Sequence, residues 1–563
     1  MRALKLGLAL GSGGGVKPNG NPSGLTIAVL SDTSLRVSHT NGATNHDGTY
    51  YYYSLDGVTN WQLGVTIVGN GTTADITGLT ENTTYYVRAA HYKSAKISEY
   101  SNIANAITYT SQMVSLVARM SVAPENDPIS GINNKIHIND TYKILRTHGL
   151  LQKSDLLYIF SSHTELSAYL NWISSNYNIT KYNNGSFVKN NYIKANGGTA
   201  DFYKISYNPY ANGVNFVLNS ACMMVFVLDK GTTDFLNSVG AYDGTNTSAM
   251  ISTKSDDRNF NSINQASSSY YTLNLTGGVL SLSRTASNLF KVFYNKVEKL
   301  RITNQASSQV PNMTMAIGGN RTGENTVLYP CDSQFMAFWA GGGLSPAEIA
   351  NLEDDITIHI SKIANRIGVI GDSTVASYLS QTAVASLFNT SNSFTIIDVS
   401  HPGDTILQQQ TLYDALTVGN KRFMRYVVVQ IGLNDLDPAE SAATALGRYQ
   451  TLINDINAIK GAGTKILLAT MTPCKQRLTD VYGATNGLIS YQKWLDMNDA
   501  IRGNGINAIT GASGYVDSHT TALNDGSGNL KSEYDMGDHI HENNTARQII
   551  ANAWFAKMQQ LEM

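Results

Sequence analysis

The chain has 563 residues, of which 42% are hydrophobic and 15% are charged. This length is more than one hydrophobic core supports, so we expect several globular domains. The 40 lysines and arginines against 42 acidic residues give a net charge of −2, which offers no electrostatic basis for binding nucleic acid. Three cysteines, Cys222, Cys331 and Cys474, lie far apart and form neither a disulfide framework nor a zinc-binding spacing.

The N-terminal segment MRALKLGLALGSGGGVKPNG has two basic residues, a short apolar stretch and a Gly-rich run. The apolar stretch is too short to span a membrane, and no Ala-x-Ala cleavage site follows it. We interpret residues 1–22 as an arm followed by a Gly-rich hinge, with a degenerate signal peptide as the alternative. No other run approaches membrane-spanning length, so no membrane insertion is expected.

Residues 23–109 contain short strand-like runs separated by turn signals, at the spacing of a β-sandwich: LTIAVL, SLRVSHT, TYYYYSLD, DITGL and TYYVRAAHY. The segment ITGLTENTTYYVRAA resembles the closing half of a fibronectin type III domain. This resemblance implies that Tyr86 is the tyrosine-corner residue, although His39 stands where the family usually has a core tryptophan. For the run Tyr50–Tyr53, strand alternation predicts two rings facing the core and two facing solvent. An exposed binding patch is the alternative.

Residues 110–360 show an all-β pattern with Asn-, Ser- and Gly-rich loops between strand-like runs: SLVARM, CMMVFVLDKG, GGVLSLSR, LFKVFYN and MTMAIGGN. The segment SQFMAFWAGGGLSPAEIANLEDDI then predicts a strand, a turn and a capped helix. Ser345 is the expected N-cap, Pro346 the first helical residue and Glu348 the partner in a capping box. This ending resembles that of concanavalin A-like (laminin G-like) β-sandwiches. A lectin role and a spacer role both remain open.

Residues 361–563 alternate apolar strands with helical stretches. The strands are RIGVIG, FTIIDVS, RYVVVQIG and TKILLATM, and the helical stretches include VASYLSQTAVASLF, ESAATALGRYQTLINDINAIK and a closing TARQIIANAWFAKM. In the closing helix we expect Ile549, Ala553 and Phe555-Ala556 to pack inward. The alternation predicts a parallel sheet with helices on both faces, and such sheets bind ligands at the carboxyl ends of their strands.

Polar segments follow these strands and also precede the closing helix. They are Gly371-Asp372-Ser373, HPGDT around Gly403, IGLND around Asn434, and DHIHEN around Asp538 and His541. Taken alone, Ser373 is better explained as the N-cap of a helix formed by VASYLSQ, Asn434 as a turn residue and His541 as a surface histidine.

Together, the four segments resemble the blocks of the SGNH (GDSL-type) hydrolases, in the same order. The resemblance covers residues 361–563 and implies an α/β three-layer, flavodoxin-like domain. It implies that Ser373 is the nucleophile and that Asp538 and His541 complete the catalytic set. The backbone N–H groups of Ser373 and Gly403 and the side-chain amide of Asn434 would form the oxyanion hole. Ser373 does not lie in a G-x-S-x-G motif, so the nucleophile elbow of α/β-hydrolases is not the template.

These residue types suit acyl transfer. A serine hydroxyl is a poor nucleophile until a base such as His541 accepts its proton, and a carboxylate such as Asp538 can orient that base. His539, beside the pair, is given a structural or substrate-edge role. A metal site from Asp538, His539 and His541 lacks a supporting H-x-x-x-H or cysteine ligand set, so neither a metal nor a cofactor is expected.

We therefore predict a serine ester hydrolase that removes O-acetyl groups from a glycan. A lipid ester or a thioester is an alternative substrate. The arm, the hinge, the two sandwich modules and the C-terminal hydrolase together resemble bacteriophage fibre, tail or head-decoration proteins. That resemblance implies a virion location, contacts of the arm with other virion proteins, and a homo-oligomer, with a trimer favoured. The alternatives are a non-enzymatic virion protein that binds host glycan and a secreted bacterial carbohydrate esterase.

Overall fold

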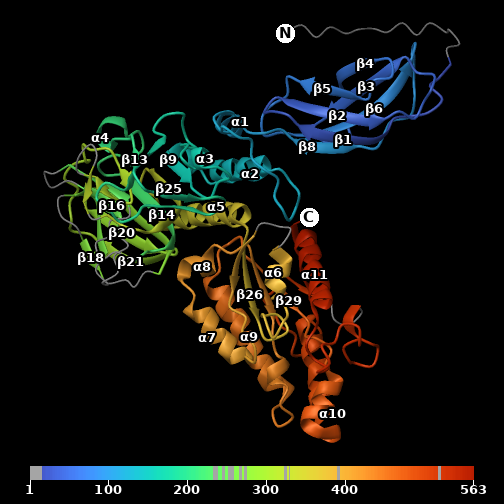
Figure 1. Ribbon diagram of the computed structural model, residues 1–563. Helices are drawn as coiled ribbons and strands as arrows, with labels where there is room; N and C mark the ends of the chain where they lie inside the picture. The colour runs from blue at the N-terminus through green and yellow to red at the C-terminus, as the bar shows by residue number, and fades with distance from the viewer. Residues whose placement is uncertain are drawn as a thin grey trace. The chain divides into compact units, whose positions relative to one another are not determined.

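The computed structural model describes residues 16–232, 239–243, 248–251, 259–265, 269–271, 276–321, 326–328, 330–389, 394–517 and 522–562 (Figure 1). Most of the expected N-terminal arm, residues 1–15, lies outside the described residues. The chain divides into two compact units, Met1–Ala118 and Arg119–Met563. None of the helices formed by the described residues is both long and apolar enough to cross a membrane.

The N-terminal unit contains two antiparallel sheets, β1-β2-β5 and β4-β3-β6-β7, and β8 pairs with β6. The strands are β1 (Ser23–Val29), β2 (Ser34–Thr40), β3 (Gly48–Ser54), β4 (Gln62–Val68), β5 (Thr73–Thr77), β6 (Thr84–Lys93), β7 (Lys96–Ile97) and β8 (Ala104–Ile107). Leu35 and Val37 of one sheet and Val87 and Ala89 of the other are fully buried in a common core.

The unit ends in helix α1 (Ser111–Ala118), where the run SLVARM was expected to form a strand. That prediction is wrong. Thr110 starts the helix, since its carbonyl accepts a hydrogen bond from the Val114 N–H and its hydroxyl accepts one from the Met113 N–H. A threonine in this position favours a helix start over a continuing strand.

Strand alternation correctly predicts the directions of the four consecutive tyrosines of β3. Tyr51 is fully buried and Tyr53 packs against the core, whereas Tyr50 and Tyr52 are half-buried on the opposite face. The prediction for the tyrosine corner is wrong by one residue. Tyr85 is the buried ring, and its hydroxyl accepts a hydrogen bond from the Thr80 N–H at 2.9 Å.

The second unit begins with a helix and has three short helical segments close to its first strands. They are α2 (Asn134–Thr147), the 3₁₀ turn η1 (Leu151–Lys153), α3 (Glu165–Ala168) and α4 (Pro209–Asn212), of which α3 and α4 lie between strands. The all-β expectation for residues 110–360 missed α2. This helix is capped by the Asn133 side chain, which accepts from the Lys135 N–H, and it buries Ile138, Tyr142 and Leu145 at helical spacing.

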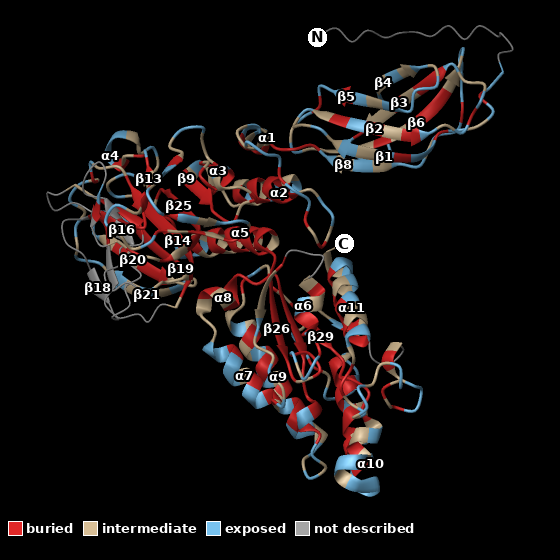
Figure 2. Ribbon diagram, in the orientation of Figure 1, coloured by how far each residue is buried: buried red, intermediate tan, exposed pale blue. Residues whose placement is uncertain are grey.

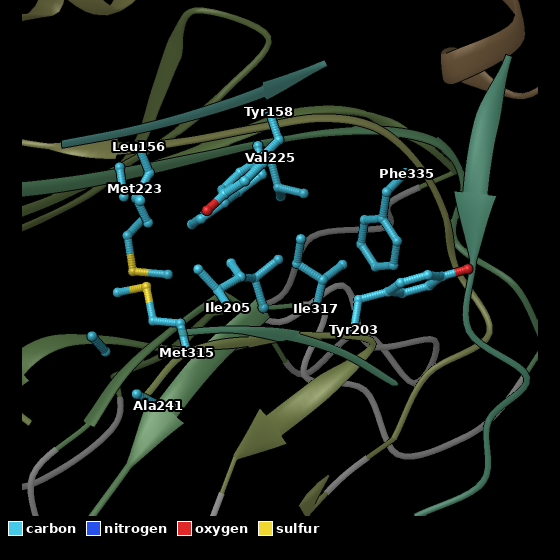
Figure 3. Close-up of a cluster of buried hydrophobic side chains, with 14 of the residues drawn as sticks. Leu156, Tyr158, Tyr203, Ile205, Met223, Val225, Ala241, Met315, Ile317 and Phe335 are labelled. Atoms are coloured by element: carbon cyan, nitrogen blue, oxygen red, sulfur yellow. The ribbon is translucent and has the colours of Figure 1, made fainter. Parts of the chain in front are cut away.

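Two large antiparallel sheets follow, ordered β10-β13-β22-β15-β16-β17-β18 and β11-β12-β25-β14-β19-β20-β21, with β9 beside β25. The strands of the first sheet are β10 (Ile179–Tyr182), β13 (Phe202–Ile205), β15 (Val239–Tyr242), β16 (Ser248–Ile251), β17 (Asn259–Gln265), β18 (Ser269–Tyr271) and β22 (Ala316–Ile317). Those of the second are β9 (Ser154–Ile159), β11 (Ser186–Val188), β12 (Tyr192–Lys194), β14 (Ala221–Asp229), β19 (Gly278–Ala286), β20 (Leu289–Tyr294), β21 (Val297–Ile302) and β25 (Gln334–Gly341). A small antiparallel pair, β23 (Gly319–Arg321) and β24 (Val327–Leu328), lies next to β15 and β22. Apolar side chains from both sheets meet in one core, in which Leu156, Met223 and Val225 face Ile205, Met315 and Ile317 (Figure 3).

Helix α5 (Pro346–Ala364) starts as predicted. The Ser345 hydroxyl accepts from the Glu348 N–H, and the Glu348 carboxylate accepts from the Ser345 N–H at 2.9 Å, which completes a capping box. The helix runs on to Ala364. Asn365 then takes a left-handed conformation with φ 47°, and the first parallel strand begins at the next residue.

The C-terminal part of this unit is a parallel sheet in the order β27-β26-β28-β29-β30. Its strands are β26 (Arg366–Gly371), β27 (Thr395–Asp398), β28 (Tyr426–Gln430), β29 (Lys465–Ala469) and β30 (Gly514–Val516). Its helices are α6 (Val384–Asn389), α7 (Ile406–Ala415), α8 (Val418–Arg422), the 3₁₀ turn η2 (Leu433–Asp435), α9 (Ala442–Ile459), α10 (Lys475–Ile501) and α11 (Asn544–Glu562).

Helices cover both faces of this sheet, as the strand–helix alternation predicts (Figure 2). On β28, Val427 and Val429 belong to the apolar cluster that contains residues of α7, α9 and α10. Val428, between them, belongs to the cluster on the other face, with Phe388 of α6 and Trp554 of α11. The central strands β26, β28 and β29 are therefore buried on both sides, which explains their continuous apolar sequences, whereas the edge strands β27 and β30 are partly exposed.

The predicted inward face of α11 is right in part. Ile549, Ala553 and Phe555 are partly buried and pack against the apolar cluster at the edge of that face, whereas Ala556 is exposed. The buried side is formed by Ala546, Arg547, Ile550, Ala551, Trp554 and Met558. Counted from Arg547, these residues have the i, i+3, i+4, i+7 spacing of one helix face. Because one of them is charged, a prediction based on apolar residues alone placed the centre of the face too far to one side.

A buried ion pair joins the start of this unit to the parallel sheet. Asp127 accepts two hydrogen bonds from the guanidinium of Arg425, which directly precedes β28, at 2.7 and 2.6 Å. Both side chains are at most 1% exposed. Burial raises the pKa of Asp127, but the hydrogen bonds from His137 and Arg425 and the charge of Arg425 outweigh it and hold that pKa far below its usual range, so the pair with Arg425 is fully charged. Because the guanidinium donates two hydrogen bonds to one carboxylate, the contact also fixes the orientation of the segment around Asp127 relative to the parallel sheet.

Three histidines of the N-terminal unit lie close together. The ring of His91 is 4.0 Å from that of His46 and 5.4 Å from that of His39, measured between centroids. His39 and His91 are buried. Burial, together with the neighbouring rings of His46 and His39, lowers the pKa of His91 to about 4, and burial also lowers the pKa of His39.

We expect the N-terminal unit to lose stability as the pH falls from about 6.5 to about 4. His91 stays neutral in the folded state down to its pKa of about 4, whereas in the unfolded chain it takes up a proton near pH 6.5. The unfolded state therefore binds more protons in this window. The stabilisation present above pH 6.5 disappears as the pH falls through the folded pKa. Hydrogen exchange of the β3 and β6 amides, measured between about pH 7 and pH 4 and corrected for intrinsic rates, tests this.

The variant His91→Gln should flatten this pH dependence. His401→Gln is a matched control, because the His401 side chain is 65% exposed in the other unit, and it should leave the profile unchanged. An equally steep profile in His91→Gln would contradict the assignment.

Candidate active site

Ser373 lies in a tight turn directly after β26. The buried carboxylate of Asp372 accepts hydrogen bonds from the backbone N–H and the hydroxyl of Thr374, at 3.0 and 2.8 Å. Its carbonyl accepts from the N–H groups of Val375 and Ala376. Burial raises the pKa of Asp372, although the hydrogen bonds from Thr374 and from the Leu433 N–H oppose that rise. The turn is therefore anchored at its first residue and holds Ser373 at the carboxyl end of the strand.

The turn does not continue into the expected helix. Residues 374–383 form turns and an isolated bridge, α6 begins only at Val384, and Ser373 is not the N-cap of a helix. The guanidinium of Arg547 explains the difference, because it donates to the carbonyls of Ser373 and Ala376 at 2.6 and 2.7 Å. Those carbonyls would otherwise accept the next helical N–H groups.

Ser373, His541 and Asp538 form one hydrogen-bonded line. The Nε2 atom of His541 is 2.8 Å from the Ser373 hydroxyl oxygen. On the other side of the ring, Nδ1 of His541 contacts the Asp538 carboxylate, which also accepts the His541 backbone N–H at 2.9 Å. A carboxylate can only accept, so Nδ1 carries the proton and Nε2 is left as an acceptor for the serine hydroxyl.

The environment keeps Asp538 ionised. Its partial burial disfavours the charge, but the backbone and side-chain hydrogen bonds from His541 outweigh burial and hold the pKa of the carboxyl below its ordinary value. The ring of His541 is buried, and the ring of Tyr378 lies over it at 4.4 Å between centroids. Tyr378 thus limits the positions that the imidazole can take.

Two further loops lie at the same edge of the sheet and are bonded to each other. In the loop after β27, the His401 N–H donates to the Gly371 carbonyl at 3.1 Å, and Gly403 has φ +84°. After β28, the Asn434 side-chain amide donates to the Asp404 carbonyl at 3.0 Å, which leaves its second N–H for another acceptor.

The backbone N–H groups of Ser373 and Gly403 donate to no acceptor within the part of the chain that the structure describes. With the second amide N–H of Asn434, three unused donors therefore belong to the loops that meet beside the nucleophile. Glycine is favoured at position 403 because its positive φ is a conformation that side chains with a Cβ rarely adopt.

His539 does not join the hydrogen-bonded line. It has φ +66°, its side chain is 48% exposed, and its Nδ1 contacts the Asp535 carboxylate at 2.9 Å. The described residues include no group of three His, Cys, Asp or Glu side chains that could hold a metal ion.

Three residues around the site were not predicted from the sequence: Tyr378, Glu542 and Arg547. Glu542 is fully buried directly after His541, and burial raises its pKa to about 7, although the charge of Arg547 opposes this. Arg547 was detectable in principle, because it occupies a helical position in line with the apolar residues Ile550, Ala551 and Trp554. A lone arginine on a buried helical face needs acceptors in the protein interior.

Comparison with known proteins gives partial matches. No protein-family profile and no curated protein matches this chain. Its structural neighbours include GDSL-like lipases and acylhydrolases. A GDSL-like lipase from Bacteroides thetaiotaomicron is 16% identical, over 35% of this chain and 90% of its own, with a TM-score of 0.29. A lipase/acylhydrolase from Enterococcus faecalis is 16% identical, over 35% of this chain and 96% of its own, with a TM-score of 0.28.

A fibronectin type III domain of human contactin 1 is 17% identical, over 19% of this chain and 92% of its own, with a TM-score of 0.16. At these identities and TM-scores the matches assign the chain to no family. The geometry of the site is therefore the basis for a functional proposal.

We expect Arg547→Lys to fold but to lower kcat by about 10- to 100-fold. Lysine keeps a positive charge beside Glu542 but cannot reproduce the two-pronged contact with the carbonyls of Ser373 and Ala376, so the nucleophile turn loosens. Kinetics on p-nitrophenyl acetate, with circular dichroism to verify folding, measure the effect. Arg502→Lys is a matched control, because Arg502 pairs with Asp499 and Asp517 instead. An unchanged kcat in a folded Arg547→Lys variant would contradict the role of Arg547 in holding the turn that carries Ser373.

Proposed function

We propose that this chain is a serine ester hydrolase that acts through an acyl-enzyme on Ser373. The observation that supports it most directly is the line from the Ser373 hydroxyl through His541 to Asp538, with 2.8 Å between serine oxygen and imidazole nitrogen. The fixed proton on Nδ1 leaves the other nitrogen free to accept the serine proton.

In the proposed reaction, the Ser373 oxygen attacks the carbonyl carbon of the ester while Nε2 of His541 takes the hydroxyl proton. The carbonyl oxygen becomes an oxyanion, which the N–H groups of Ser373 and Gly403 and the amide of Asn434 stabilise. His541 then gives its proton to the alcohol oxygen, the bond from carbon to that oxygen breaks, and the acyl group stays on Ser373. Water, deprotonated by His541, attacks the acyl group in the same way and releases the acid and the free serine.

We further propose that the ester is an O-acetyl group on a glycan. The proposed architecture, two β-sandwich modules of fibronectin type III-like and concanavalin A-like (laminin G-like) type before a flavodoxin-like domain, suits an enzyme held on a polysaccharide. Paired antiparallel sheets in both units support the sandwich part. The order β27-β26-β28-β29-β30 corresponds to the 2-1-3-4-5 order of doubly wound sheets, which supports the flavodoxin-like part.

The same organisation supports a proposal about the setting. An esterase for host surface polysaccharide, carried on a bacteriophage fibre, tail or head-decoration protein, would combine attachment and deacetylation in one chain. In that setting the N-terminal arm would contact other virion proteins and the chain would form a homo-oligomer, with a trimer favoured.

Replacing Ser373 by alanine should abolish hydrolysis of p-nitrophenyl acetate and acetate release from acetylated capsular polysaccharides. The variant keeps the turn, because the Asp372 and Arg547 contacts involve main-chain atoms of residues 373–376 or the Thr374 hydroxyl. Ser527→Ala, in an exposed loop, is the matched control and should keep full activity. Full activity in Ser373→Ala would rule out the mechanism.

Replacing Asn434 by alanine should lower kcat by about 10²- to 10³-fold, the usual effect of removing one oxyanion donor, with a small change in KM. The donor acts on charge that develops in the transition state, so binding of the neutral ester is little affected. Steady-state kinetics on p-nitrophenyl acetate separate the two constants, and the exposed Asn504→Ala serves as control. A change confined to KM would place Asn434 in substrate binding instead.

A further inference from the structure

The outer face of the β4-β3-β6-β7 sheet carries a continuous row of four tyrosines, Tyr50, Tyr52, Tyr92 and Tyr100, which we call the tyrosine row. The rings of Tyr50 and Tyr92 stack with centroids 4.3 Å apart. Tyr52 meets Tyr50 at 6.1 Å and Tyr100 at 5.9 Å, both edge to face. Each ring is half-buried or exposed, so the row presents aromatic surface to solvent.

The strands beneath the row leave space for it. Gly48 of β3 lies opposite Tyr92 of β6, and a Cβ at Gly48 would lie 2.7 Å from the Tyr92 ring. Ala90 lies opposite Tyr50, so a small side chain separates the larger ones on β6. The hydroxyls of the row make no hydrogen bond within the described part of the chain. The row therefore combines flat apolar rings with unused polar tips.

Arg88 lies at one end of the row, opposite Tyr52 in the sheet register. Its guanidinium carbon is 3.7 Å from the centroid of the Tyr100 ring and 4.1 Å from that of Trp61. Two ring faces hold the cation in place. This contact stabilises the charge but uses none of its N–H donors in the plane of the guanidinium.

Arg88 has no carboxylate partner among the residues that the structure describes, and its buried Nε has no hydrogen-bond acceptor. Arg36 of the other sheet in the same unit differs, because it makes a two-pronged contact with Asp75. Buried or half-buried guanidinium groups are normally paired, and their planar fork matches a carboxylate. The terminal amino groups of Arg88, and not its buried Nε, are the donors that remain for an external anion.

We propose that the tyrosine row and Arg88 form a binding site for an acidic polysaccharide. The carboxylate of a uronic acid residue pairs with the Arg88 fork, and the apolar faces of neighbouring pyranose rings lie on the tyrosine rings. The tyrosine hydroxyls bond the sugar hydroxyls. Aromatic rings with a polar tip suit such a ligand, which has both apolar faces and hydroxyl groups. An acidic peptide would use Arg88 but would have no need of a flat row of rings.

This site lies in the N-terminal unit and goes beyond the proposed esterase, because it needs none of the residues around Ser373. The test uses the full chain with Ser373→Ala, so that no substrate is turned over. Two uronate polymers, polygalacturonate and alginate, serve as probes in affinity electrophoresis and calorimetry. The comparison polymers are carboxyl-reduced polygalacturonate, neutral dextran and poly-glutamate.

We expect binding to at least one uronate polymer and at least 10-fold weaker binding to its carboxyl-reduced form, to dextran and to poly-glutamate. Arg88→Met should weaken uronate binding at least 10-fold, and Tyr50→Ala should weaken it several-fold. Arg88→Lys keeps the charge and should fall between the wild type and Arg88→Met. Arg36→Met, on the other sheet, is the matched control for loss of an arginine and should bind like the parent chain.

Several outcomes would overturn the proposal: no binding to either uronate polymer, equal binding to poly-glutamate or to the carboxyl-reduced polymer, or equal loss in Arg36→Met and Arg88→Met. Hydrogen exchange of the β3 and β6 amides shows whether each variant keeps its fold. If Arg88→Met unfolds the sheet, Arg88→Lys and Tyr50→Ala decide the matter. The chain that keeps Ser373 should bind the polymers with the same affinities as the Ser373→Ala chain. Absence of esterase activity would therefore contradict the esterase proposal but not this one.

Discussion

The parallel pairing of β26 with β27 and β28 is the constraint on which the rest of the candidate site depends. Val369 pairs with Asp398, and Gly371 pairs with Gln430, so all three strands end at the same edge of the sheet. The loops that follow them carry Ser373, Gly403 and Asn434. Residues separated by up to about 60 positions in the sequence are thus brought to one edge by backbone hydrogen bonds alone. The side-chain contacts among the loops then refine positions that the sheet has already set.

The remaining groups come from one short segment before and within α11. This segment supplies Asp538 and His541 in a loop, Glu542 beneath them and Arg547 in the first turns of the helix. The packing of α11 on the sheet, through Trp554 and Met558, therefore determines where the base lies relative to the serine. Arg547 adds a second connection, because it bonds the carbonyls on either side of the nucleophile turn. Helix packing and catalytic geometry are for this reason coupled in a single element.

The sequence predicts the centre of the parallel sheet well because β26, β28 and β29 are buried on both faces and read as continuous apolar runs. It predicts the capping box of α5 for a similar reason, since all the interacting groups lie within four residues. The positions of the polar segments at the strand ends are also predictable, because the chain order and the sheet topology bring them to one edge. Their chemical roles remain predictions.

The errors at α1 and α2 lie in local caps, Thr110 and Asn133, that an all-β interpretation passed over. Other errors arise where tertiary contacts decide a local conformation. The stretch VASYLSQ has helical composition, but Arg547, more than 160 positions away, donates hydrogen bonds to the carbonyls of Ser373 and Ala376. A helix would need those carbonyls as acceptors for its own N–H groups. In α11 the charged Arg547 lies on the buried face, so a search for apolar residues found the edge of that face and not its centre. Tyr85 and Tyr86 are chemically identical neighbours, and only the phase of the strand separates them. In each of these other cases the missing information is tertiary, and no local pattern contains it.

The two proposed sites depend on different physical forces. Pairing of a uronate with Arg88 is an attraction between full charges at the protein surface, which added salt screens. Attack of Ser373 on an acetyl ester begins from two neutral groups, and the charge that develops is stabilised by fixed N–H donors next to it, where salt has little access. If one polymer occupies both sites, its capture and its deacetylation respond differently to ionic strength. The acidic residues of the polymer would then determine where the chain attaches, and its acetyl groups would determine what the enzyme removes.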